Sequence, residues 1–222
     1  MSQRWRCGIA LAGAALLTAA CAGTGSSASS EPYRFHARDA SVRVDSPQLR
    51  KQKAAAGIES CPVTQRTSPA PDGSLPDGSL PDVTLPCLGG GRDVNLSGLR
   101  GTPLVLNFWS QTCGPCRAES PLFQQVHEAA GDRVRVLGID WQDPRPAYAI
   151  GFADELGLTY PQIADPDGAT RAPMRITALP VTVLVDAHGQ IVHTEFGAVD
   201  SVEELTTLID DQLGVSVATG LR

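Results

Sequence analysis

Two cysteines separated by two residues, Cys113 and Cys116, constrain this chain more than any other feature. An apolar run of β-type residues, 104–106, leads into them, and a helical pattern, 117–130, follows them. A Cys-x-x-Cys pair at such a corner is typical of a redox-active dithiol. If Cys113 begins the helix, unpaired backbone N–H groups and the helix dipole favour its thiolate, lowering the pKa from about 8.5 to about 3.5–7.5. Cys116, one turn further on, could then attack a mixed disulfide on Cys113 and release the partner.

A zinc site and a permanent structural disulfide are the two alternatives for this pair. Zinc usually takes four ligands, often from a second Cys-x-x-Cys or from His-x-x-x-His. The chain has neither, because its other cysteines stand singly and its four histidines are scattered. A permanent disulfide needs neither Gly-Pro between its cysteines nor a corner between a strand and a helix. We therefore predict a redox-active pair, with no metal and no organic cofactor.

The residues around the pair resemble the active-site region of thioredoxin. The resemblance rests on Asn-Phe-Trp at 107–109, on Cys-Gly-Pro-Cys at 113–116, and on Pro121 in the following helix. It also rests on Leu-Pro-Val-Thr at 179–182, which is similar to the cis-proline loop of that fold. The resemblance covers about 80–214 and is closest to the TlpA-like (ResA-like) thiol–disulfide oxidoreductases, which are membrane-anchored and extracytoplasmic.

Two departures from thioredoxin lie next to the dithiol. Thr112 stands where thioredoxins usually have Trp, and Asn107 stands where thioredoxin has a buried aspartate. Because Asn cannot exchange a proton near neutral pH, another group must do so. Glu119 matches a glutamate that the TlpA-like subgroup keeps near its dithiol, and helical spacing places it on the same face as Cys116. The alternative is an acidic residue of the first turn that the helix dipole merely favours.

The resemblance implies a role for each residue of the site. Cys113 is the expected nucleophile, Cys116 the resolving cysteine, and Glu119 the group that moves the Cys116 proton. Pro180, expected to be cis, would hold its loop against the dithiol, and the backbone of Leu179 could pair with a partner peptide as an added strand. The predicted site consists of the catalytic residues Cys113, Cys116, Glu119 and Pro180 and the binding residues Trp109, Gly114, Pro115 and Leu179.

The expected function is electron exchange between this dithiol and the thiols or disulfides of exported proteins. The resemblance implies either reduction in cytochrome c maturation or oxidative folding, with a membrane-bound electron donor or acceptor. A peroxiredoxin-like thiol peroxidase would show Pro-x-x-x-Thr-x-x-Cys, but Leu106 and Ser110 occupy the Pro and Thr positions. A copper-delivery protein would show Cys-x-x-x-Cys and a distant histidine. A binding module with an inert disulfide is the non-enzymatic alternative, and it would leave Cys113 unreactive to alkylation after mild reduction.

The composition excludes one large class of partners. The formal net charge is -6 and the sequence pI is about 5.2, whereas a nucleic-acid-binding surface needs a basic patch. Aromatic residues make up only 5% of the chain, so a stacking platform for bases is not expected either. We expect a monomer that does not bind nucleic acid.

The N-terminus predicts export and a lipid anchor. Residues 1–6 carry two arginines, and 8–20 are apolar or small throughout but too few to span a bilayer, which takes about 20 residues. Two alanines precede Cys21 and a Gly/Ser-rich tract follows it. This arrangement resembles a bacterial lipoprotein signal in which Cys21 is lipidated. The alternatives are cleavage near Ala20, giving a soluble secreted or periplasmic protein, and an uncleaved anchor.

Cys61 and Cys87 form a second candidate pair, because an even number of cysteines in an exported chain suggests disulfides. A bond between them would close a loop of about 26 residues and contribute about 3 kcal/mol to stability. We expect a structural staple that holds the N-terminal arm to the domain. The alternative is a second redox pair that relays electrons to Cys113 and Cys116.

The remaining pattern indicates one α/β domain after an N-terminal extension. We divide the chain into a signal peptide with the lipoprotein-type cysteine (1–21), a flexible tether and arm (22–79), and a thioredoxin-like domain (80–222). Strands are expected at 103–109, 134–140, 160–164, 181–186 and 190–196, and helices at 117–130, 143–156, 170–176 (short and irregular) and 201–213. This order predicts the thioredoxin fold, a central mixed sheet with helices on both faces.

Overall fold

β3 (Leu104–Trp109) is the central strand of a five-stranded sheet in the computed structural model, which describes residues 42–65 and 75–217. β4 pairs in parallel with β3 and with β5, whereas β6 pairs antiparallel with β3 and with β7. The bounds of these strands are β4 Arg135–Trp141, β5 Gln162–Asp165, β6 Val181–Val185 and β7 Ile191–Phe196. The order is β5-β4-β3-β6-β7, so the predicted central mixed sheet is confirmed.

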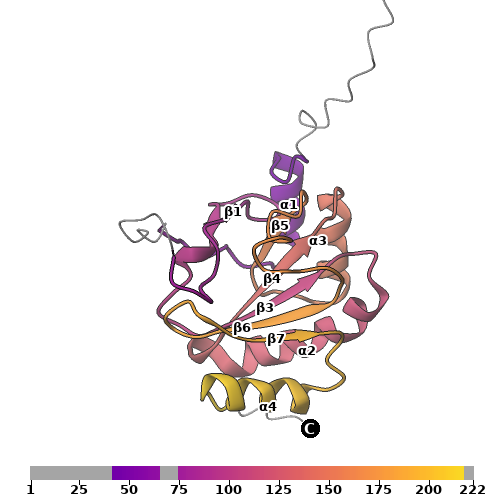
Figure 1. Cartoon of the computed structure of the whole chain (residues 1–222). Coiled ribbons are helices and arrows are strands. Elements are labelled where there is room, and N and C mark those ends of the chain that lie inside the picture. The colour runs from indigo at the N-terminus through magenta and orange to yellow at the C-terminus, as the bar shows by residue number, and fades with distance from the viewer. Residues whose placement is uncertain (1–41, 66–74, 218–222) are drawn as a thin grey trace, which may run out of the picture. The chain divides into compact units, whose positions relative to one another are not determined.

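The α-helices contribute to the core on one face of this sheet (Figure 1). α2 (Gly114–Ala130) joins β3 to β4, and α3 (Pro146–Glu155) joins β4 to β5. Each helix connects two adjacent parallel strands, and both connections move across the sheet in the same direction, from β3 to β4 and from β4 to β5. Because such crossovers are right-handed, both helices lie on the same face. α4 (Val202–Leu213) packs against α2, and α1 (Pro47–Ala55) packs against α3.

The second face is covered by β1 (Thr84–Leu85), β2 (Val94–Asn95) and the 3₁₀ helix η1 (Leu96–Gly98). The α-helices of the described residues therefore lie on one face of the sheet, not on both as predicted. A further 3₁₀ turn, η2, occupies Gly131–Arg133 after α2. The sheet thus has a hydrophobic core on each face, and alternate residues of β3 point into one core or the other. For this reason every side chain of the strand is either apolar or, as at Asn107, hydrogen-bonded.

The helix predicted at 170–176 is wrong. The chain forms turns there, although Met174 and Ile176 are buried in the second core. Pro173 has no N–H with which to continue a helical ladder, and Arg175 adopts a φ of 56°, which ends any right-handed helix. The helix was expected because the resembled fold tends to have one before the proline loop, and these two local constraints prevent it here.

The last helix follows its predicted start and stop signals. The Ser201 hydroxyl accepts a hydrogen bond from the Glu204 N–H, and Gly214 ends α4 with a φ of 64°. α1, by contrast, was not predicted. Its signals are Ser46, whose hydroxyl accepts from the Leu49 N–H, and a proline in the first turn. No helix in the described residues is long and apolar enough to cross a membrane.

Cys61 and Cys87 form a disulfide with a Cα–Cα distance of 5.9 Å. Cys87 forms an isolated antiparallel bridge with Ile163 at the free edge of β5. The arm is also fixed by backbone, since the Glu59 N–H donates to the Thr159 carbonyl oxygen at 2.8 Å. The disulfide therefore fastens the segment that carries α1 to the edge of the sheet.

Gly138 in β4 provides the space for a buried hydrogen bond beneath the active-site corner. The Trp109 Nε1–H donates to Gln162 Oε1 at 2.9 Å, and both side chains are fully buried. A Cβ at position 138 would overlap with Gln162 Oε1 and lie 2.9 Å from Trp109 Nε1. A side chain there must therefore displace the amide or the indole.

We predict that Gly138→Ala lowers the free energy of unfolding by about 1–3 kcal/mol, because it breaks this buried hydrogen bond or forces repacking. Gly151→Ala is the matched control. Gly151 lies in α3 with nothing within 4 Å of its Cβ position, so alanine there should raise stability by about 0.5–1 kcal/mol. Urea unfolding of both variants measures the two shifts. Unchanged stability of Gly138→Ala would contradict this account of the packing.

Candidate active site

Cys113 lies at the corner between β3 and α2, where it is the N-cap residue of the helix. It forms a disulfide with Cys116 across a Cα–Cα distance of 5.2 Å, and the Cys116 N–H donates to Cys113 Sγ at 3.2 Å. Pro115 lies in the first helical turn, where its missing N–H costs nothing. Cys113 is partly exposed and Cys116 is fully buried. An incoming sulfur therefore meets Cys113 first.

The surroundings of Cys113 favour a negative sulfur once the disulfide opens. The first N–H groups of α2 and the positive end of its dipole point at the N-cap. Arg117 adds a positive charge one residue after Cys116. Its guanidinium lies 4.9 Å from the centre of the Phe152 ring and pairs with Glu155 at 2.9 Å. Such a position is where low cysteine pKa values occur.

The proline loop lies at the same end of the sheet as the dithiol. The Leu179–Pro180 peptide bond is cis. Phe108 in β3 is paired with Val181 in β6, so the antiparallel register places Pro180 beside the end of β3. Pro180 is buried and Leu179 is partly exposed. Within the described residues, the Leu179 backbone forms no hydrogen bond with another backbone group, so both of its polar groups are open to an added strand.

Glu119 is a buried carboxylate, 1% exposed, between α2 and the segment before α4. Its Oε1 accepts from Asn107 Nδ2 at 2.8 Å and its Oε2 accepts from the Val199 N–H at 3.0 Å. Burial raises the pKa of Glu119 to about 7, and the hydrogen bonds from Val199 and Asn107 counteract part of that rise. A group with this pKa can take or give a proton at neutral pH, as an asparagine cannot.

Asn107 can accommodate both protonation states of Glu119. Its Oδ1 is buried and has no hydrogen-bond partner among the described residues. When Glu119 gains a proton, rotation of the Asn107 amide would let Oδ1 accept the new O–H in place of the present N–H donation. In the sequence, Asn107 was noted only as a departure from thioredoxin. Its hydrogen bond with Glu119 arises because β3 and α2 pack against each other.

Three of the residues near the dithiol that were predicted to bind a partner occupy different environments. Gly114 and Pro115 are exposed beside the dithiol, where a partner would approach. The Trp109 side chain, predicted to contribute to partner binding, is fully buried and stacks on Phe152 with ring centres 4.6 Å apart. It supports the corner from inside and does not face a partner.

A second buried acid, Asp140, was not singled out from the sequence. It lies in β4 opposite Trp109, and neither carboxylate oxygen has a hydrogen-bond partner in the described part of the chain. Burial raises its pKa well above the usual range, and the nearby carboxylates of Asp143 and Asp165 raise it further. The described residues contain no cluster of three or more potential metal ligands.

Comparison with known proteins agrees with this geometry. The family model described as AhpC/TSA family matches residues 76–194, more than half of the chain. The thiol:disulfide interchange protein DsbE of Xylella fastidiosa is 35% identical over 97 residues, 43% of this chain and 48% of that relative. The thiol-disulfide oxidoreductase ResA of Halalkalibacterium halodurans is 30% identical over 122 residues, 54% of this chain and 69% of that relative. A solved structure of a DsbF homologue from Corynebacterium diphtheriae is 30% identical with a TM-score of 0.55, covering 67% of this chain and 99% of that chain.

The fold is that of the thioredoxin-like thiol–disulfide oxidoreductases. The chain belongs to the AhpC/TSA family and, within it, to the ResA-like proteins, so the resemblance read from the sequence is confirmed; it is also similar to DsbE. The chain spans about half the length of the DsbE relative that it matches.

We predict a pH dependence of stability that belongs to Glu119. Its pKa is about 7 in the folded protein against an ordinary 4.5, so the folded state holds the proton more strongly than the unfolded chain. The contribution is therefore fully present below about pH 4.5 and is lost as pH rises to about 7, by up to about 3 kcal/mol. Urea unfolding at pH 4.5 and 7.5 should show that the parent loses more stability over this interval than Glu119→Gln.

The control for this measurement is Glu203→Gln, at an exposed glutamate of α4. That variant should follow the parent. An equal change with pH in the parent and in Glu119→Gln would mean that Glu119 does not titrate in this interval.

Proposed function

We propose that the protein is an extracytoplasmic thiol–disulfide oxidoreductase whose Cys113–Cys116 pair exchanges electrons with protein thiols and disulfides. One observation carries the proposal: a partly exposed sulfur at a helix N-cap is bonded to a buried one, beside a cis-proline loop with a free backbone edge. The ResA and DsbE relatives, named as thiol–disulfide oxidoreductase and interchange protein, support the reaction type.

The reaction proceeds by two exchanges at sulfur. The Cys113 thiolate attacks one sulfur of a partner disulfide, and the other partner sulfur leaves as a thiolate with the bonding electrons. Cys116 then loses its proton and attacks Cys113, which releases the second partner sulfur. The partner gains two electrons and the protein becomes oxidised. Run in reverse, the same steps oxidise a partner dithiol.

Glu119 is the proposed acceptor of the Cys116 proton. Cys116 is fully buried, so water has little access to its thiol. Glu119 follows three residues later on the same face of α2, with a pKa of about 7. A base with such a pKa accepts a proton from a thiol near neutral pH and returns it in the reverse direction.

The proposed substrate is a polypeptide segment in extended conformation. It would pair with the backbone of Leu179 and lie against exposed Gly114 and Pro115, placing its sulfur at Cys113. The family resemblance suggests exported proteins, among them apocytochrome c, with a membrane-bound electron donor or acceptor and a monomeric oxidoreductase. The direction of electron flow depends on that second partner.

We predict that Cys116→Ser traps the partner. With a disulfide-containing protein such as insulin, this variant should accumulate a covalent adduct at Cys113, because no second thiol releases it. Cys113→Ser should form none, and the parent should form it only transiently. Non-reducing electrophoresis and peptide mass spectrometry identify the adduct. An adduct on Cys116 in Cys113→Ser, equal in yield, would reverse the assigned roles.

We also infer that the protein is exported and anchored through a lipid on Cys21, ahead of a tether and arm (22–79) and the thioredoxin-like domain (80–222). Residues 1–41 lie outside the described part of the chain, so support comes from the N-terminal pattern and from the Cys61–Cys87 disulfide, which is typical of oxidising compartments. Palmitate labelling and membrane fractionation test this. The parent should be labelled and membrane-bound, and Cys21→Ser should be neither; an unlabelled parent in the soluble fraction contradicts the anchor.

A further inference from the structure

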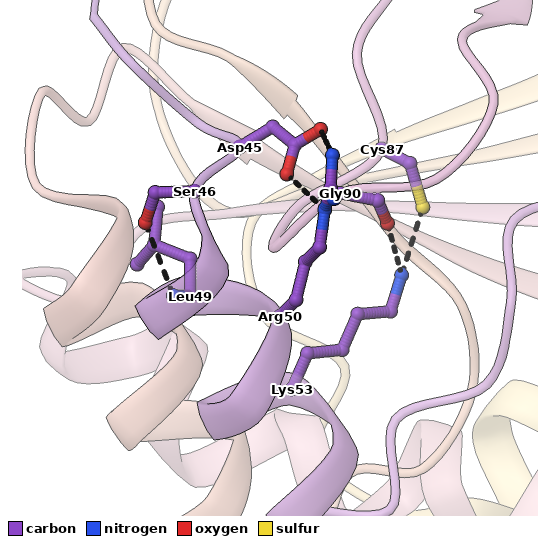
Figure 2. A network of polar contacts seen from close by, with 7 residues as sticks. All are labelled: Asp45, Ser46, Leu49, Arg50, Lys53, Cys87 and Gly90. Atoms are coloured by element: carbon purple, nitrogen blue, oxygen red, sulfur yellow. Dashed lines mark hydrogen bonds and ion pairs between the residues drawn. The ribbon is translucent and has the colours of Figure 1, made fainter.

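Lys53 points its ammonium group at the second disulfide. It lies on the inner side of α1, is only 8% exposed, and its Nζ donates to Cys87 Sγ at 2.9 Å and to the Gly90 carbonyl oxygen at 3.1 Å (Figure 2). A disulfide sulfur is a neutral, weak acceptor, so this contact repays little of the cost of burying a charge. A thiolate at Cys87 would repay far more.

Among the described residues, no carboxylate forms a hydrogen bond or ion pair with Lys53, whose partners are Cys87 and Gly90. Asp45, whose charge acts on Lys53, forms a two-pronged pair with Arg50, with both nitrogen–oxygen distances at 2.7 Å (Figure 2). Burial accordingly lowers the pKa of Lys53, and the charge of Asp45 offsets part of that shift. The ammonium is thus held beside Cys87, and its positive charge is compensated only in part, by Asp45, while the disulfide is intact.

The two sulfurs of this disulfide have opposite surroundings. Cys61 Sγ lies 3.2 Å from the Gln162 carbonyl oxygen, which repels a thiolate but can accept a hydrogen bond from a thiol. Cys87 Sγ faces an ammonium, which stabilises a thiolate. Cys61 is also the more exposed residue, at 7% against 1% for Cys87. This geometry favours Cys61 as the sulfur that is attacked and Cys87 as the sulfur that leaves as a thiolate.

A hollow lies beside residues that flank the two cysteines. A pocket of about 420 Å³ is lined by Lys53, by Ser60 next to Cys61, and by Gly91. A Cβ on Gly91 would lie 3.2 Å from Cys87 Sγ, so glycine at this position keeps the side of that sulfur clear. Neither cysteine lines this hollow, but it reaches Lys53 and the residue that precedes Cys61.

We propose that Cys61–Cys87 is a second thiol-exchange site, at which a low-molecular-weight thiol attacks Cys61 and Cys87 leaves as a thiolate paired with Lys53. The electron pair of the incoming thiolate forms a bond to Cys61 Sγ, and the pair of the broken bond passes to Cys87 Sγ. A second thiolate attacks the small-molecule sulfur and releases Cys61, which takes a proton from water. The two small thiols leave as their disulfide, and the protein has gained two electrons. The segment that carries α1 is then no longer fastened to the sheet edge by a disulfide.

This site is separate from the Cys113–Cys116 dithiol. Cys87 is bridged to the outer edge of β5, and β4 lies between β5 and β3, so three strand spacings, about 14 Å, separate the Cys87 backbone from β3. Direct exchange of sulfur between the two pairs of one chain would need large movement. The thiol must come from solution.

The test uses the full chain with Cys7→Ser, Cys21→Ser, Cys113→Ser and Cys116→Ser, so that only the second pair reacts. Limiting 2-mercaptoethanol, a neutral thiol that Lys53 does not attract by charge, is added and the reaction is stopped with acid. Peptide mass spectrometry should find the mixed disulfide on Cys61 in at least tenfold excess over Cys87. An adduct mainly on Cys87, or equal on both, overturns the proposal.

Substitution of the lysine gives an independent test. Lys53→Met should slow reduction about tenfold, because the leaving thiolate loses its counter-charge, whereas Lys51→Met, at an exposed lysine of the same helix, should leave the rate unchanged. An equal rate in Lys53→Met overturns the proposal, as does reduction that is no faster than global unfolding. If Lys53→Met fails to fold, the position of the adduct in the parent decides alone.

Discussion

The position of Cys113 depends on how completely β3 is enclosed. Both edges of this strand are paired and both of its faces are covered, so its end cannot move without disturbing four strands and the helical layer. Cys113 follows that end by four residues and caps α2. The strand fixes one side of the corner and the helix, with Pro115 in its first turn, fixes the other. The reactive sulfur is therefore held by the core, although it lies at the surface.

The Asn107–Glu119 pair gives this framework a buried group that can titrate near neutral pH. In a buried site of low polarity, a carboxylate with only two hydrogen-bond donors remains easy to protonate, which is how its pKa reaches about 7. An aspartate at position 107 would place a second negative charge against Glu119, and the two groups would titrate as a pair. Asparagine keeps a single titrating group at the site and can donate or accept beside it.

The sequence predicted those parts of the molecule whose signals are local. The dithiol, the apolar central strand and the cap of the last helix all follow from a few adjacent residues, and they appear where they were expected. The fold followed from the order of the elements, because right-handed crossovers leave few arrangements for a strand–helix–strand series.

What escaped prediction had either a weak local signal or depended on a contact between distant residues. The helix at 170–176 was expected from the resemblance to the thioredoxin fold, but a proline and one residue with positive φ made the segment a set of turns. The helix α1 has a weak apolar face, and only Ser46-Pro47 indicated its start. The approach of Lys53 to Cys87 joins positions 34 residues apart, and no spacing rule connects them.

The central claim is that the N-cap position makes Cys113 a thiolate near neutral pH. The most direct measurement is the rate of carbamidomethylation of Cys113 in the reduced full chain between pH 4 and 10, followed by peptide mass spectrometry so that each cysteine is read separately. The account predicts a midpoint below about pH 7.5, with Cys116 labelled far more slowly. A midpoint at about 8.5 or above, as in an unperturbed cysteine, would contradict it.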